Sequence, residues 1–281
     1  MNTNVAPLSS EDLERLRWAY TQLEHPSFAA RLSNVVGRPI ERGLQLLPKT
    51  WYQRVHDAAF VSILGVLRVA IDSMRDEIPP GATQDQLHRV LAVAAGAAGG
   101  FLGPLTLLVE LPFTTLLMLR SIADIARSEG EDLNEAEARL ACVQVFALGG
   151  RTDRDRAADT GYYGLRLTLG LHFSYAPLHT GAARSPINMP GGIEFIRGVA
   201  ARFGTTMSDS AAVKLIPIAG AVSGALLNLA FMQHYQDIAR GHFVVRRLER
   251  QYGADTVRVA YEQVAGEEAH AAREFSPLEG W

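Results

Sequence analysis

The sequence predicts an all-α fold, a multi-helix bundle with two glycine-rich apolar segments at its centre. Along most of the chain, apolar residues recur at three- and four-residue intervals, as they do on one face of a helix. Alternating apolar and polar runs bounded by turn residues are few, so strands are not expected. The two central segments, residues 90–109 and 215–236, contain no Asp, Glu, Lys or Arg.

The composition excludes several classes of protein. Of the 281 residues, 48% are apolar and 20% are charged, which excludes a globally disordered chain. The formal net charge of −3 gives no strongly basic surface for nucleic acid. The single cysteine, Cys142, excludes an internal disulfide and a cysteine-based zinc site, and we expect it to be a small buried group. The first residues show no secretory signal, so a cytoplasmic location is expected.

Three helices are expected in the first 81 residues. Ser9 and Asp12 have the spacing of a capping box, which predicts the start of the first helix, and Pro26 ends it. Helical spacing of apolar residues then continues through residues 28–47 and 52–74.

The first glycine-rich segment is expected to form a helix, a turn near Gly103-Pro104 and a second helix that runs to about Ser128. Glycines four residues apart lie on one helix face and let another helix approach closely. The second segment repeats this spacing. The predicted helix-packing residues are Gly96, Gly99, Gly100, Gly103, Gly220 and Gly224.

The remaining elements are ordinary helices. One is expected to start at Asn134 and to end at Gly149-Gly150, and another covers residues 157–175. Residues 176–192 are rich in proline and glycine and form the clearest predicted loop, or a subdomain boundary if there is one. A helix then begins near Ile193. The last helix is expected over residues 254–273, before a short tail.

The two apolar segments have two interpretations. Residues 90–128 and 215–236 are long enough to enter a bilayer, or they are core helices buried against each other through their glycine faces. Arginines after the second segment could contact anionic lipid headgroups, or they could form a solvated helix face. These predicted membrane-surface residues are Arg240, Arg246, Arg247 and Arg250.

Catalytic and metal-binding motifs are missing from the sequence. It contains no glycine-rich phosphate-binding motif, no nucleophile elbow and no HExxH. Glu267 and His270 have the spacing of a di-iron ligand pair, but a di-iron bundle needs that pair twice. We therefore predict no metal and no cofactor, and we lean towards a protein that is not an enzyme.

Polar residues within and beside the apolar segments are the better candidates for a site. Glu110 in an apolar helix needs a partner or a raised pKa, and Arg120 roughly shares its face. Such residues could bind a headgroup or perform acid–base chemistry, with Glu110, Arg120 and His242 as catalytic candidates, or they could only fix helix packing. The candidate ligand-binding residues are Glu110, Arg120, Tyr162, Tyr163, Lys214, Asn228 and His242.

Several short motifs, taken in order, resemble the EcsC family over about residues 85–250. They are Gly96–Gly100, Glu110–Pro112, Leu119–Ala123, Val145–Gly150, Gly161–Tyr163, Lys214–Ala221, Asn228 and Ala239–Phe243. The resemblance implies a bacterial, mostly helical protein that is cytoplasmic or associated with the inner membrane. The family is named for a protein encoded beside an ABC transporter, and it supplies no established catalytic residues.

These observations lead to one leading function and two alternatives. The chain divides into N-terminal helices (1–81), an EcsC-like core (82–253) and a C-terminal helix with a tail (254–281), which together form one compact domain. We expect a membrane-associated protein that binds lipid or another amphiphile. We also expect it to serve a transport or envelope system, with an ABC transporter or other membrane protein as partner. The alternatives are a hydrolase acting on a lipid-like substrate and a scaffold for a membrane transporter.

Overall fold

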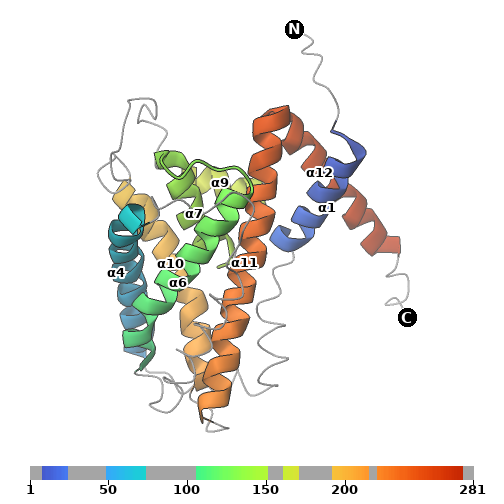
Figure 1. The fold of residues 1–281 in the computed structure, drawn as a ribbon. Helices are drawn as coiled ribbons and strands as arrows, with labels where there is room; N and C mark the ends of the chain where they lie inside the picture. Colours follow the sequence, from blue (N-terminus) through green and yellow to red (C-terminus); the bar gives the residue numbers. More distant parts are fainter. Residues whose placement is uncertain are drawn as a thin grey trace, which may run out of the picture.

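In the part of the chain that the computed structural model describes, the regular elements are all α-helices. The structure describes residues 8–24, 49–73, 106–150, 161–170, 192–214 and 220–274. The helices in these ranges are α1 (Ser10–Glu24), α4 (Lys49–Ser73), α6 (Thr106–Ser128), α7 (Ala136–Leu148), α9 (Tyr162–Gly170), α10 (Gly192–Lys214), α11 (Gly220–Tyr252) and α12 (Ala254–Glu274) (Figure 1). The predicted all-α class is confirmed.

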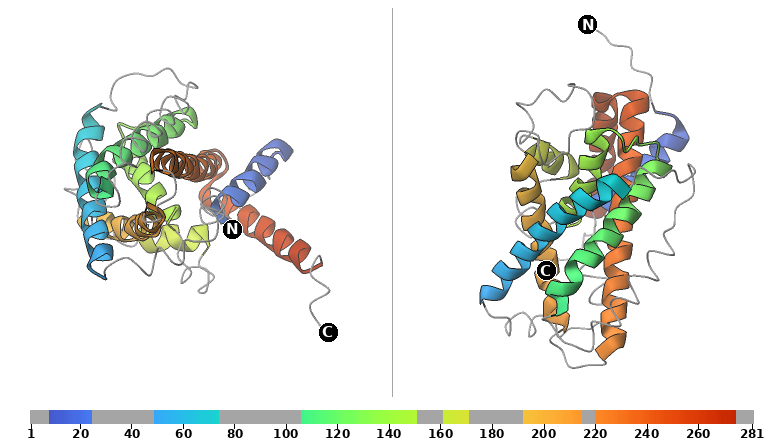
Figure 2. Two further views of the ribbon diagram at one scale, coloured as in Figure 1. Left: turned by 90° about the horizontal axis from the view of Figure 1, so that it is seen from below. Right: turned by 60° about the vertical axis from the view of Figure 1, so that its left-hand side comes forward.

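The bundle is organised around α11. Helix α4 packs against α6 and α10, and α6 packs against α11 (Figures 1 and 2). Helix α7 contacts α6, α10 and α11, so it lies inside the bundle. Helices α1 and α12 pack on α11 and diverge on its far side from α4 (Figure 2). Aromatic rings from three helices meet in the core, where Phe146 lies 4.8 Å from Phe203 and 5.4 Å from Tyr235 between ring centroids.

The start of α1 follows the predicted capping chemistry. The amide of Asp12 donates to the hydroxyl of Ser9 at 3.1 Å, which satisfies one of the free amides of the first turn. The buried face then consists of Leu16, Ala19, Tyr20 and Leu23, at helical spacing. The predicted helix over residues 28–47 lies outside the described residues.

Helix α6 ends at Ser128 as predicted, and it contains Pro112. The start of α7 differs from the prediction. Asn134 donates from its backbone and side-chain amides to the carboxylate of Asp132, both at 2.9 Å, and the N-cap position falls to Glu135. A local turn therefore uses the side chain that was expected to cap the helix.

Helix α11 joins two stretches of different chemistry. Its 33 residues contain most of the second apolar segment and the arginines that follow it. Among the described residues, no helix is both long enough and apolar enough to span a membrane. The predicted loop at 176–192 lies outside the described residues except for its last residue, which begins α10.

Close helix contacts occur at Gly149 and Gly150, which are not among the six predicted packing glycines. Gly149 has φ −74°, so its backbone conformation does not require a glycine. A Cβ at this position, however, would lie 2.5 Å from the ring of Tyr235. A Cβ on Gly150 would lie 2.7 Å from the carbonyl oxygen of Arg202 on α10. Gly96, Gly99, Gly100 and Gly103 lie outside the described residues, and the surroundings of Gly220 and Gly224 in α11 are not described.

Candidate functional site

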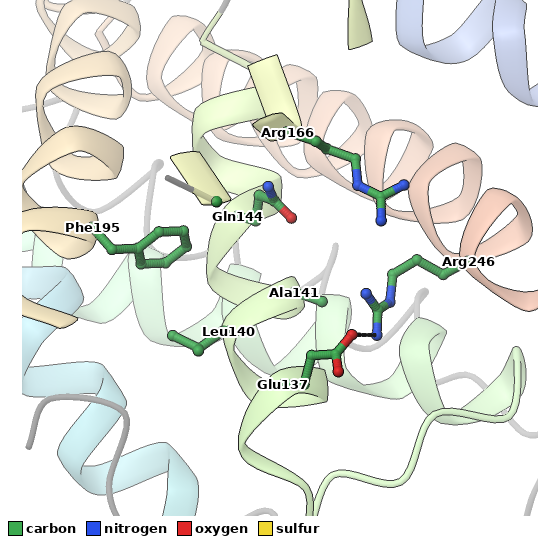
Figure 3. Close-up of a pocket in the computed structure, with 8 residues that line it drawn as sticks. Glu137, Leu140, Ala141, Gln144, Arg166, Phe195 and Arg246 are labelled. Atoms are coloured by element: carbon green, nitrogen blue, oxygen red, sulfur yellow. Dashed lines mark hydrogen bonds and ion pairs between the residues drawn. The ribbon is translucent and has the colours of Figure 1, made fainter. Parts of the chain in front are cut away.

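A cavity of about 210 Å³ lies between α7, α9, α10 and α11. Its lining residues are Glu137, Leu140, Ala141, Gln144, Arg166, Gly170, Phe195 and Arg246 (Figure 3). Those from α7 follow Glu137 by three, four and seven residues, so they share one face of that helix. Arg166 and Gly170 are likewise one turn apart on α9. The residues that α7 and α9 contribute to the lining therefore each lie on a single face of their helix.

The cavity has an apolar side and a charged side. The ring of Phe195 and the side chain of Leu140 lie on one side of the view in Figure 3. The guanidinium groups of Arg166 and Arg246 come from the opposite side and point toward each other. Gln144 lies between these two sides. The arrangement is suited to a ligand that has both an apolar part and a polar or charged part.

Arg166 is held in place by a carboxylate of α11. Its two terminal nitrogens donate to the two carboxylate oxygens of Glu249 at 2.7 and 3.0 Å, a bidentate pair that fixes the guanidinium plane. Burial by itself lowers the pKa of Arg166, but Tyr162 and Glu249 outweigh burial and raise it. The guanidinium also lies over the rings of Tyr162 and Tyr163, 5.3 and 5.6 Å from their centroids. It is thus a permanent, oriented cation.

Arg246 is shared between two carboxylates. Its Nε and one terminal nitrogen donate to Glu131 at 2.8 and 3.3 Å, and that same terminal nitrogen donates to Glu137 at 3.1 Å. Glu131 also accepts a hydrogen bond from Arg250. The side chain of Glu131 is only 4% exposed, whereas that of Glu137 is 66% exposed. Arg246 therefore has one internal partner and one at the rim of the cavity.

A buried hydrogen-bond network extends from Arg166 into the core. The hydroxyl of Tyr162 lies 2.8 Å from Nδ1 of His242 and accepts a hydrogen bond from Arg166 at 3.2 Å. Because Arg166 can only donate, the hydrogen of the Tyr162 hydroxyl is free to go to Nδ1, which places the ring proton of His242 on Nε2. Nε2 has no hydrogen-bond partner among the described residues. Burial, assisted by the charges of Arg166 and Arg246, lowers the pKa of His242 well below 6.5, so the ring is neutral.

Glu24 joins three helices near this network. One oxygen of its carboxylate accepts from the backbone amide of Tyr162 at 2.8 Å and from the hydroxyl of Tyr261 at 3.0 Å. Burial, together with this carboxylate, raises the pKa of Tyr261. The contact ties the end of α1 to the start of α9 and to α12.

The predicted site residues are only partly brought together. Tyr162 and His242 are in direct contact, and the hydroxyl of Tyr163 donates to Glu249 at 3.0 Å. Arg120 is exposed on α6 and Asn228 is buried on α11, and neither lines the cavity. Of the predicted catalytic group, Arg120 is thus at the surface while His242 is fully buried. Glu110 and Lys214 lie in α6 and α10, but their side chains are outside the description.

The arginines predicted at a membrane surface all have acidic partners in the chain. Arg240 pairs with Asp237 at 2.8 Å, and Arg250 pairs with Glu131. The Nε atom of Arg247 lies 3.3 Å from a carboxylate oxygen of Glu129, but the two do not have hydrogen-bond geometry. With the pairs of Arg246 described above, much of the positive charge of this run is offset internally. The role of these arginines at a membrane stays a prediction.

Sequence reasoning missed Glu137, Gln144, Arg166 and Glu249. A usable signal exists in α11, where His242, Arg246 and Glu249 are spaced four and then three residues apart on one face. The sequence predicts His242 as a candidate site residue and Arg246 as a membrane-surface residue, but it does not connect them, because it does not show which helix covers this face.

No group of three or more His, Cys, Asp or Glu side chains in the described ranges could hold a metal ion. Cys142 is buried, and burial raises the pKa of its thiol to about 12. The thiol is therefore a packing group at neutral pH rather than a nucleophile.

Comparison with known proteins identifies the chain at the family level. The model of the EcsC protein family matches residues 68–248, which include every lining residue of the cavity. Comparisons with curated proteins and with solved structures gave no match.

Proposed function

The chain belongs to the EcsC protein family, whose model covers more than half of it, and we propose that it is a non-enzymatic protein that binds a small anionic amphiphile. The observation that carries this proposal is the two-sided cavity. Arg166 and Arg246 offer oriented cations to a charged group, and Leu140 and Phe195 offer an apolar surface to a hydrocarbon part (Figure 3).

The size of the cavity limits the ligand. Cavities for drug-sized ligands measure about 300–1,000 Å³, and this one measures about 210 Å³. A complete membrane lipid is too large to enter it. The occupant is therefore a short-chain amphiphile, or the charged end of a longer one whose chain extends out of the cavity.

A longer amphiphile would place the protein beside a membrane. In that case the apolar part that the cavity does not cover remains in the bilayer, and the protein binds peripherally. Purified protein should then sediment with vesicles of anionic lipid more than with vesicles of neutral lipid. Equal sedimentation with both would limit the proposal to soluble amphiphiles.

The direct test is calorimetric titration with eight-carbon probes that differ only in charge. We expect octanoate to bind at least tenfold more tightly than octanol or octylammonium, because only octanoate meets the guanidinium groups with a negative charge. Gln144→Glu adds a negative charge to the cavity wall at constant volume. We expect it to weaken octanoate binding about tenfold or more.

The matched control is Gln263→Glu, the same change on the exposed surface of α12. It should leave octanoate binding unchanged, and both variants should unfold like the unmodified chain. The proposal is wrong if octanoate does not bind, or if octanol binds equally well. Native mass spectrometry of the purified protein adds an independent readout, since a retained amphiphile would appear as a fixed mass increase.

A further inference from the structure

We propose that the ligand carries a single negative charge and that this charge takes the place of the Glu137 carboxylate on Arg246. The inference rests on the proposed function and specifies the charge of its ligand. It comes from the difference between the two carboxylates that share Arg246.

Glu131 is the permanent partner. It accepts two hydrogen bonds from Arg246 and a further one from Arg250, and it is nearly inaccessible to solvent. Removing a carboxylate of this kind from its partners would leave buried charges uncompensated. A ligand therefore cannot compete for the side of the guanidinium that faces Glu131.

Glu137 is the exchangeable partner. It accepts one hydrogen bond from Arg246, at 3.1 Å, and two thirds of its side chain is exposed. Exposed ion pairs contribute little to stability, because the side chains lose conformational freedom and water screens their charges. Glu137 can rotate into water at small cost and leave a donor of Arg246 available.

The balance of charge sets the class of ligand. The cluster contains three cations and three carboxylates, namely Arg166, Arg246 and Arg250 with Glu249, Glu131 and Glu137. With the carboxylate of Glu137 in place, the charges of this cluster therefore balance. A ligand with one negative charge restores the same balance when Glu137 leaves, whereas a ligand with two adds an uncompensated charge to a partly buried site.

The position of Glu137 also orients the ligand. Its contact with Arg246 lies at the charged end of the cavity (Figure 3). Leu140 and Ala141 follow Glu137 by one turn on the same face of α7. A charged group that replaces the carboxylate therefore has its hydrocarbon part alongside Leu140, in the direction of Phe195.

The test compares the unmodified protein with Glu137→Gln, which removes the competing charge and keeps the shape. We expect octanoate to bind the variant about two- to fivefold more tightly, the range that loss of an exposed ion pair provides. Octyl sulfate, also a monoanion, should behave like octanoate, and this arm separates a carboxylate requirement from a charge requirement. Octyl phosphate at pH 8 carries close to two charges, so it should bind the unmodified protein more weakly and gain most from the variant.

Glu135→Gln is the matched control, since it removes the same charge two residues earlier, from an exposed side chain that makes no capping bond and does not line the cavity. It should change octanoate binding by less than the Glu137 variant. Octanoate binding that is unchanged or weaker in Glu137→Gln overturns this inference and leaves the proposed function standing. Absence of octanoate binding to both proteins overturns the two together.

Discussion

Single residues of the cavity depend on partners that are distant in the sequence. Glu249 orients Arg166 from 83 residues away, and Glu131 orients Arg246 from 115 residues away. Charge-assisted, paired hydrogen bonds of this kind hold a guanidinium in one plane. The two cations are therefore already arranged before any ligand enters, which reduces the entropic cost of binding.

His242 should make the stability of the protein depend on pH. Its pKa in the folded state lies well below 6.5, and in the unfolded chain it returns to about 6.5, so below that pH the unfolded state binds more protons. Stability should fall as the pH is lowered from about 6.5 to about 5. His242→Gln should flatten this part of the profile, measured as the free energy of unfolding in urea at each pH.

His56 provides the control for that measurement. Burial also lowers its pKa, but the ring is only partly buried. His56→Gln should therefore flatten the pH profile less than His242→Gln. A profile that is equally steep without His242 would show that the acid sensitivity comes from other groups.

At the level of helices, the end of α7 depends on close contact rather than on turn geometry. Gly150→Ala would place a methyl group 2.7 Å from the Arg202 carbonyl oxygen, and a backbone atom cannot move aside by side-chain rotation. We expect a loss of about 1–3 kcal/mol in the free energy of unfolding. Gly266→Ala, in open space on α12, should instead gain about 0.5–1 kcal/mol from helix propensity. Urea unfolding of both variants checks the pair, and equal effects of the two would contradict the packing argument.

Helix positions were predictable from the sequence because they depend on local chemistry. Ser9 caps α1, α6 ends at Ser128, and α12 covers the expected residues. The predicted N-cap of α7 was wrong by one residue, since Glu135 takes that position and Asn134 binds Asp132 instead. The site was only partly predictable. Tyr162, Tyr163 and His242 were named, but Arg166 was not, because its role appears only once α9 lies against α11.

At the level of the whole molecule, stability should differ strongly along the chain. The middle of α11, from Phe231 to Val245, is almost entirely buried, whereas residues 266–271 of α12 are exposed. Few tertiary contacts protect the second stretch, so its helix can open without global unfolding. Hydrogen exchange should be slow in the first stretch, because the free energy of opening there should approach that of global unfolding. Exchange in residues 266–271 should be faster by orders of magnitude, and uniform protection along both helices would contradict this ordering.

The uninterrupted length of α11 constrains how the chain can vary. Its 33 residues make a rod of about 50 Å, and one face of that rod carries Tyr235 in the core, His242 in the network and Arg246 in the cavity. Inserting or deleting one residue between Tyr235 and His242 would rotate everything beyond it by about 100°, so the core and the cavity could not both keep their partners. Changes of chain length are therefore confined to segments outside this helix, whereas substitutions within it can be absorbed one position at a time.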